Sequence, residues 1–159
     1  MTDRDPVIHP TAIVEDGAQV APGVEVGPFC RVGPEAVLAP GVRLISHVVV
    51  DGRTTIGSGT TVYPFVVLGG PPQHLRDPGE GTVLEIGAGC TIREHASIHR
   101  GTMLGGGRTV VGDGALIMCA AHVGHDCVIE NEVILTANCA LAGHVTVGRK
   151  AIVGGLAGV

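Results

Sequence analysis

Branched aliphatic residues recur every six positions along most of the chain. The first series is Ile8, Val14, Val20, Val26, Val32, Leu38, Leu44, Val50, Ile56, Val62 and Leu68. The second is Ile86, Ile92, Ile98 and Leu104, continuing after a slip of one residue as Val111, Ile117, Val123, Ile129, Leu135, Leu141, Val147, Val153 and Val159. A period of six fits neither an amphipathic helix nor an alternating strand, and it predicts a hexapeptide-repeat solenoid.

Small or β-branched residues form a parallel series, four positions after the aliphatic residues. They are Ala12, Ala18, Val24, Cys30, Ala36, Val42, Val48, Thr54, Thr60, Val66, Cys90, Ala96, Thr102, Ala115, Ala121, Cys127, Val133, Cys139, Val145, Ala151 and Ala157. Together the two series predict an all-β fold, a single-stranded parallel β-helix whose core both series fill. Three short strands would make a coil of about eighteen residues. Successive coils would stack about 4.8 Å apart.

Two breaks in the period predict loops on a single domain that spans residues 1–159. Between Leu68 and Ile86 the chain reads GGPPQHLRDPGEGTVLE, where Pro, Gly and charged residues favour one long extruded loop over about 69–85. The stretch GGGR at 105–108 accounts for the one-residue slip and predicts a short loop over about 105–110. Loops carried by a rigid scaffold are frequent places for function.

Composition narrows the function classes. The chain has no Trp, one Tyr and two Phe, which suits a narrow aliphatic core, and its net charge of −5 argues against broad nucleic-acid binding. We find neither an apolar run of about 20 residues nor a signal-peptide layout, and therefore expect a cytoplasmic protein without a membrane span. Among the cysteines, Cys119 alone lies outside the inward series, so we expect packing cysteines rather than disulfides or a thiolate zinc site.

The eight histidines all lie outside both inward series, and two of them fall in the stretch CAAHVGHDCV at 119–128. A coil of about eighteen residues puts Gly143 above His125 and His144 beside it. We expect His99, His122, His125 and His144 to form one strip, with His122, His125 and Asp126 facing outward. This pattern is typical of proton transfer by imidazole or of a three-histidine zinc site, although any one histidine alone is more typical of a solvated surface residue.

Several motifs in order resemble the UDP-N-acetylglucosamine O-acyltransferases of lipid A biosynthesis. They are IHPTAIVEDGA, VGPFCRVGP, SHVVVDGRTTIG, IREHASIHRGT, AHVGHDC and LAGHVTVG, and the similarity covers residues 7–159. The resemblance implies a left-handed coil and transfer of a (3R)-hydroxyacyl chain from acyl carrier protein to the 3-hydroxyl of UDP-N-acetylglucosamine, the first step of lipid A (lipopolysaccharide) synthesis. It further implies a homotrimer with active sites between subunits, no cofactor, no metal and no covalent acyl-enzyme.

The resemblance also implies roles for individual residues. His125 matches the general base, Asp126 its acidic partner, and the backbone N–H of Gly143 the donor to the oxyanion. The positions that match substrate-binding residues are Gln73, His74, Arg76, His99, His122 and His144. In the family arrangement, His125 would work against the loop near residues 73–76 of a neighbouring subunit.

Two departures from the family pattern leave alternatives open. The family commonly has Gln-Asp-Leu-Lys where this chain has Gln73-His74-Leu75-Arg76, so a 3-hydroxyl or a 3-amino acceptor and the acyl chain length both stay open. Family members also continue past this sequence with further coils and a C-terminal helical domain, so we expect a truncated core of low or no activity. The remaining alternatives are another nucleotide-sugar acyltransferase, a γ-carbonic-anhydrase-like zinc enzyme and a non-catalytic β-helical scaffold.

Overall fold

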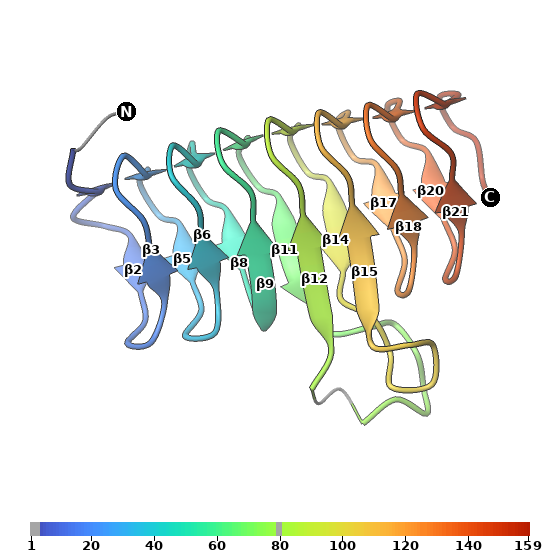
Figure 1. Cartoon of the computed structure of the whole chain (residues 1–159), viewed down its shortest axis with the longest axis horizontal. Helices are drawn as coiled ribbons and strands as arrows, with labels where there is room; N and C mark the ends of the chain where they lie inside the picture. The colour runs from blue at the N-terminus through green and yellow to red at the C-terminus, as the bar shows by residue number, and fades with distance from the viewer. Residues whose placement is uncertain (1–3, 79–80) are drawn as a thin grey trace.

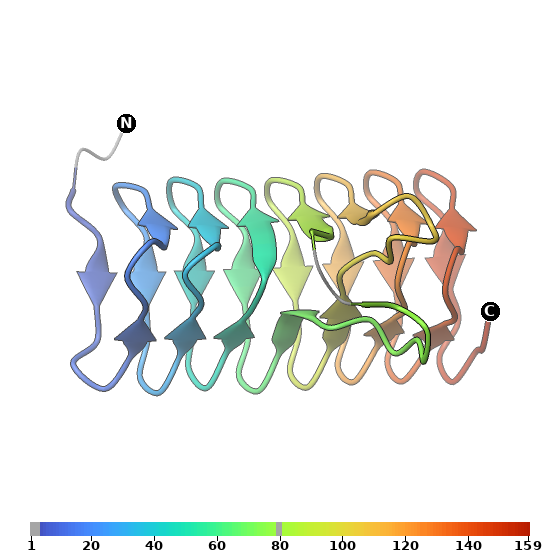
Figure 2. The ribbon, with the colours of Figure 1, turned by 90° about the horizontal axis from the view of Figure 1, so that it is seen from below.

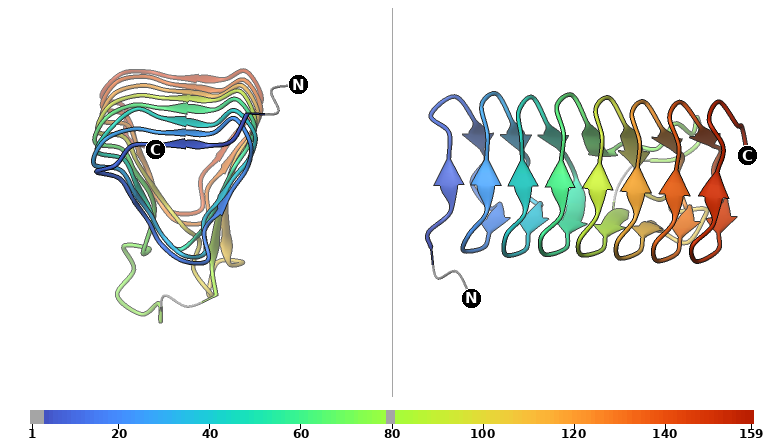
Figure 3. Two further views of the ribbon diagram at one scale, coloured as in Figure 1. Left: turned by 90° about the vertical axis from the view of Figure 1, so that its left-hand side faces the viewer. Right: turned by 90° about the horizontal axis from the view of Figure 1, so that it is seen from above.

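The chain forms a parallel β-helix with a triangular cross-section, as the left view of Figure 3 shows end-on. The structure is a computed structural model that describes residues 4–78 and 81–159. Residues 1–3 of the expected domain and residues 79 and 80 of the expected loop lie outside this description. Three sheets make the three sides of the prism, and successive strands of the chain lie in successive sheets (Figure 1).

The strands are short because the chain turns a corner after almost every hexapeptide. Sheet A contains β1 (Val7–Ile8), β4 (Glu25–Val26), β7 (Arg43–Leu44), β10 (Thr61–Val62), β13 (Thr91–Ile92), β16 (Leu116–Ile117), β19 (Ile134–Leu135) and β22 (Ile152–Val153). Sheet B contains β2 (Ile13–Val14), β5 (Arg31–Val32), β8 (Val49–Val50), β11 (Val67–Gly70), β14 (Ser97–His99), β17 (His122–Val123) and β20 (Ala140–Leu141). Sheet C contains β3 (Gln19–Val20), β6 (Val37–Leu38), β9 (Arg53–Ile56), β12 (Val83–Ile86), β15 (Arg108–Val111), β18 (Val128–Ile129) and β21 (Thr146–Val147).

Parallel pairing brings equivalent positions of successive coils together. Ile134, for example, pairs with Ile152, the residue eighteen positions on. Thr61 instead pairs with Thr91, because the long loop leaves the prism between these two coils and the chain returns in the same register. The period of six is therefore confirmed as the repeat of the fold, and it fixes which side chains point inward.

Both inward series form the core, except at three places. The two ends of the prism are open, so Ile8 and Val159 are exposed and several inward residues of the terminal coils are half-buried. The third place corrects the sequence prediction: Leu104, assigned to the inward series, is 70% exposed, because it lies in the second loop. Leu84, which the sequence placed in a loop, is instead fully buried in β12.

Both loops leave the prism at the corner between sheets B and C, as Figure 2 shows from below (Figure 2). The first runs from 71 to 82 between β11 and β12, and the second from 100 to 107 between β14 and β15. The first loop is shorter than the predicted 69–85, because β11 extends to Gly70 beside β14 and β12 begins at Val83, where it pairs with β9 and β15. The second loop lies earlier than the predicted 105–110, because β14 ends at His99 and β15 begins at Arg108. Within the described residues there is no helix that could span a membrane.

Shortening a core side chain is expected to cost far more stability than shortening an outward one. Leu135 is fully buried in β19, and Leu135→Ala should lower the free energy of unfolding by about 2–5 kcal/mol, because it removes apolar contacts and leaves a cavity. Ile152→Ala, on the outer face of the same sheet, is the control, with an expected change within about 0.5 kcal/mol. Urea unfolding measures both, and equal losses would contradict the inward assignment.

Candidate active site

The candidate site lies at the corner between sheets B and C, where two successive coils stack. His125 and Asp126 turn the corner after β17, and Gly143 and His144 turn it after β20. Because β17 pairs with β20, the two corners lie directly one above the other, and the N–H of His144 donates to the carbonyl of His125 at 2.9 Å. Gly143 thus lies one coil from His125.

His125 and Asp126 form a hydrogen-bonded pair. The Nδ1 of His125 lies 2.8 Å from Oδ2 of Asp126, and the side chains are 13% and 1% exposed. Asp126 lies outside the hydrophobic core, but it is buried because the second loop covers it. Its backbone adopts a left-handed conformation, with φ of 59°, at the tip of the corner, and this turns the carboxylate beneath the second loop instead of toward solvent.

Two threonines hold Asp126 in place. The hydroxyl of Thr102 donates to Oδ2 at 2.6 Å, its N–H donates to Oδ1 at 2.9 Å, and the N–H of Asp126 donates to the hydroxyl of Thr109 at 2.8 Å. Burial raises the pKa of the Asp126 carboxyl. The bonds from Thr102 and His125 lower that pKa and outweigh burial, so the pKa lies below its ordinary value. Asp126 is therefore a carboxylate near neutral pH.

Sequence reasoning did not identify these two threonines as part of the site. Thr102 belongs to the small inward series, where a packing role accounted for it, and Thr109 lies in the region where the period breaks. The one available signal was their polarity, because a buried hydroxyl needs a hydrogen-bond partner, but Thr54 and Thr60 are buried in the same way away from the site.

Gly143 packs so closely against His125 that no side chain fits there. A Cβ built on Gly143 would contact Cε1 of the His125 ring and lie 2.7 Å from its Nε2. With Nδ1 bonded to the Asp126 carboxylate, Nδ1 carries the proton and Nε2 is the basic nitrogen. The basic nitrogen and the Gly143 backbone therefore line the same space.

That space is a cavity of about 170 Å³. Its lining residues are Gln73, His99, His122, Gly124, His125, Ala142 and Gly143. The rings of His99 and His122 lie 5.2 Å apart, and burial, followed by the nearby His99, lowers the pKa of His122. The Nδ1 of His99 donates to the Pro71 carbonyl at 2.7 Å, which leaves Nε2 to accept from the Gln73 amide at 3.5 Å.

The remaining predicted residues lie around this cavity. His74 places its ring edge-on to His125 at 5.4 Å, and His144 does so at 5.0 Å from the next coil. Arg76 is exposed in the loop, where its N–H donates to Nδ1 of His74 at 3.4 Å, and it is not among the residues that line the cavity. Within this chain, the loop that carries His74 contacts His125, and the neighbour's loop that the resemblance implies stays a prediction.

The donor set does not match a three-histidine zinc site. Within the described residues, the group whose potential ligand atoms lie within 4.8 Å of one another is His125, Asp126 and His144. It contains two imidazoles, and Oδ2 of Asp126 already accepts bonds from His125 and Thr102. We therefore derive no metal chemistry from this chain's residues.

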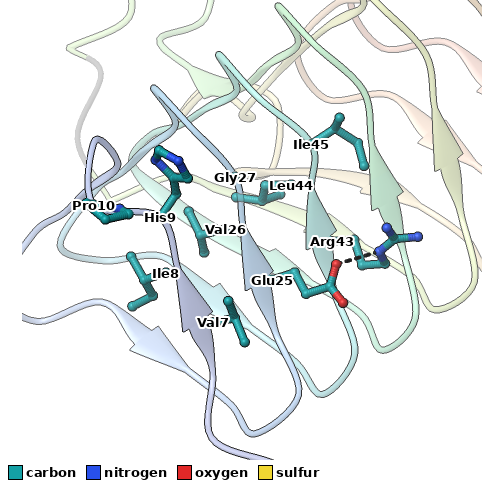
Figure 4. A pocket seen from close by; sticks show the side chains of 10 residues that line it. All are labelled: Val7, Ile8, His9, Pro10, Glu25, Val26, Gly27, Arg43, Leu44 and Ile45. Carbon is teal, nitrogen blue, oxygen red and sulfur yellow. Dashed lines mark hydrogen bonds and ion pairs between the residues drawn. The ribbon is translucent and has the colours of Figure 1, made fainter.

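A larger hollow of about 460 Å³ lies on sheet A at the N-terminal end (Figure 4). Its charged groups pair with each other: Nε of Arg43 donates a hydrogen bond to Oε2 of Glu25 at 2.9 Å, which the dashed line in Figure 4 marks. Its imidazole, His9, bonds to Thr11 at 2.9 Å. This hollow offers no base with a paired carboxylate, so the candidate site remains the corner between sheets B and C.

The sequence has close relatives among known enzymes, although no protein-family model matches it. It is 52% identical over 148 residues to the acyl-[acyl-carrier-protein]–UDP-N-acetylglucosamine O-acyltransferase of Sinorhizobium fredii, and equally identical to that of Rhizobium etli. Each alignment covers 93% of this chain, but the chain spans only 55% and 54% of the lengths of these relatives.

Solved structures agree with the sequence comparison. LpxA from Acinetobacter baumannii superposes with a TM-score of 0.94 at 42% identity, covering 96% of this chain and 59% of that one. The UDP-N-acetylglucosamine O-acyltransferase of Moraxella catarrhalis also gives 0.94, at 40% identity, covering 95% of this chain and 59% of its own. The coil is the left-handed β-helix of these neighbours. By sequence and by fold, the chain is a relative of the UDP-N-acetylglucosamine O-acyltransferases that spans about half of their length.

Proposed function

We propose that the chain is an acyltransferase that moves a (3R)-hydroxyacyl chain from acyl carrier protein to the 3-hydroxyl of UDP-N-acetylglucosamine, the first step of lipid A biosynthesis. The observation that carries this proposal is the His125–Asp126 pair, bonded at 2.8 Å, beside a cavity that Gly143 also lines. The relatives are named for this donor and this acceptor, which supports the choice of substrates.

In the proposed reaction, Nε2 of His125 removes the proton of the sugar hydroxyl while the hydroxyl oxygen attacks the carbonyl carbon of the thioester. Asp126, bonded to Nδ1, stabilises the imidazolium that forms. The carbonyl oxygen becomes negatively charged, and we assign the Gly143 N–H as its donor. When the intermediate collapses, the C–S bond breaks, and the imidazolium returns its proton to the departing thiolate of the carrier protein.

The substrates are proposed to contact the residues around the cavity. Gln73, His99 and His122 line it, and His74 and His144 flank His125. With a lowered pKa, His122 is neutral near pH 7 and suits a hydrogen bond to a sugar hydroxyl better than an ion pair. Arg76, at the exposed end of the loop, is assigned to an anionic group of a substrate, as the resemblance implies.

We further infer that the protein works as a homotrimer in the cytoplasm, where acyl carrier protein and sugar nucleotides are found. Analytical ultracentrifugation of the purified chain tests the oligomeric state, with a particle of three chains as the expected result. A monomer at micromolar concentration would overturn this part of the proposal.

Incubation of the purified chain with (3R)-hydroxyacyl carrier protein and UDP-N-acetylglucosamine tests the proposed reaction, with the Rhizobium etli relative as positive control. We expect an O-acylated sugar nucleotide by mass spectrometry, and a rate below the relative's still supports the proposal. An acceptor with a 3-amino group runs in parallel, and acylation of that acceptor alone would point to an N-acyltransferase. No product with either acceptor, where the relative turns over, would contradict the proposal that this chain is itself active, and would agree with the expectation of an inactive truncated core.

A further inference from the structure

Thr102 joins the His125–Asp126 pair to the two loops that leave the prism. We propose that Thr102 is a positioning residue, which fixes the Asp126 carboxylate and through it the orientation of His125. Neither the family resemblance nor the names of the relatives assign it a role. The inference rests on the proposed function, because positioning of a base has a purpose only where the base reacts.

The contact between Thr102 and Asp126 involves both carboxylate oxygens. Thr102 donates from its N–H to Oδ1 at 2.9 Å and from its hydroxyl to Oδ2 at 2.6 Å, and it is itself fully buried. Two donors from one residue fix both the place and the plane of the carboxylate. The oxygen that receives the hydroxyl is also the one that receives Nδ1 of His125, so the plane of the carboxylate sets the direction of the imidazole.

Thr102 also holds the second loop in shape and ties it to the first. Its carbonyl accepts the N–H groups of Gly105 at 3.1 Å and of Gly107 at 2.8 Å. The N–H of the next residue, Met103, donates to the carboxylate of Asp77 in the first loop at 3.0 Å. The first loop in turn brings His74 to the ring of His125. Hydrogen bonds and ring contacts thus connect Thr102, Asp126 and His125 with both loops.

Two conservative substitutions separate the role of the Thr102 hydroxyl from the roles of its backbone and its shape. Thr102→Val keeps the shape and the backbone N–H but loses the donor to Oδ2, whereas Thr102→Ser keeps the donor and loses a methyl group. Among the described residues, the titratable groups that face His125 are Asp126 on its own corner, His144 on the next coil and His74 on the loop. All three remain in both variants, so a difference between the variants reports the hydroxyl.

In the acyl-transfer assay, Thr102→Val is expected to lower kcat by about ten- to a hundredfold with KM unchanged, from the loss of one hydrogen bond to a charged group. Thr102→Ser should restore kcat to near the wild-type value. Thr60→Val is the matched control: Thr60 occupies the same inward position of its repeat, and its buried hydroxyl donates to the Gly87 carbonyl, away from the site. It should leave kcat unchanged.

A second measurement does not depend on acyl transfer. Carbon-13 NMR of the Asp126 carboxyl should show its pKa shifted upward in Thr102→Val and near wild type in Thr102→Ser, because the bonds from Thr102 lower it. Loss of kcat in the serine variant instead of the valine variant, or an unmoved carboxyl pKa in the valine variant, would overturn the inference. An inactive wild-type chain would defeat the proposed function, while the NMR titration would still decide whether Thr102 holds Asp126.

Discussion

His125→Ala is expected to lower kcat/KM for acyl transfer by about 10²- to 10⁴-fold, the usual contribution of general acid–base catalysis. The imidazole is oriented by a buried carboxylate at 2.8 Å and lines the cavity with Nε2, so its removal takes away the base and the acid of the proposed reaction together. Steady-state rates with acyl carrier protein as donor measure the effect. Added imidazole, which fits the space that alanine leaves, should restore part of the rate.

The matched control for this variant is His9→Ala. His9 is an exposed imidazole of the first coil that bonds to Thr11, and its replacement should leave kcat/KM unchanged. Circular dichroism of both variants verifies that the β-helix is intact. Full activity of His125→Ala would remove His125 from the reaction and with it the proposed mechanism.

Gly143→Ala is expected to reduce kcat/KM by about 100-fold, which is the scale of a displacement of roughly 1 Å in a reacting group. A methyl group at this position would contact Cε1 of His125 and come within 2.7 Å of Nε2, so the ring has to move or the corner has to open. Either movement separates the basic nitrogen from the backbone N–H that we assign to the oxyanion.

Gly148→Ala serves as the comparison, because a Cβ there meets no atom within 4 Å. It should retain activity and stability. In Gly143→Ala the pH dependence of kcat/KM should also change, since the displaced imidazole loses its bond to Asp126. If both variants had wild-type rates, close packing of Gly143 on His125 would have no part in the reaction.

The sequence predicted the interior of this protein well because one rule, the period of six, governs every coil. Val123, Ala121 and Cys127 are buried as that rule requires. The rule also places His125 on a corner and Gly143 on the next coil, which is the geometry observed. In a solenoid, residues one coil apart in the sequence, here eighteen positions, lie next to each other. The stacking could therefore be inferred without knowledge of side-chain packing.

The rule fails where the chain leaves the prism. Leu104 keeps the spacing but lies exposed, and Leu84 is buried although it follows a stretch rich in Pro and Gly. The burial of Asp126 was not predicted, for a related reason. Its direction depends on a left-handed backbone at the corner and on a loop that folds over it, and neither of these follows from hydrophobic spacing.

The stacking of His125 under Gly143 makes the gap between base and backbone donor a property of the sheet ladder. Neighbouring strands lie about 4.8 Å apart in any β-sheet, whatever side chains they carry. The proposed reaction centre therefore spans two coils, and the sheet spacing sets the distance between its two parts. Coils added or lost elsewhere along the prism would change its length and its ends, while one coil inserted between residues 126 and 143 would take the two halves of the centre out of each other's reach.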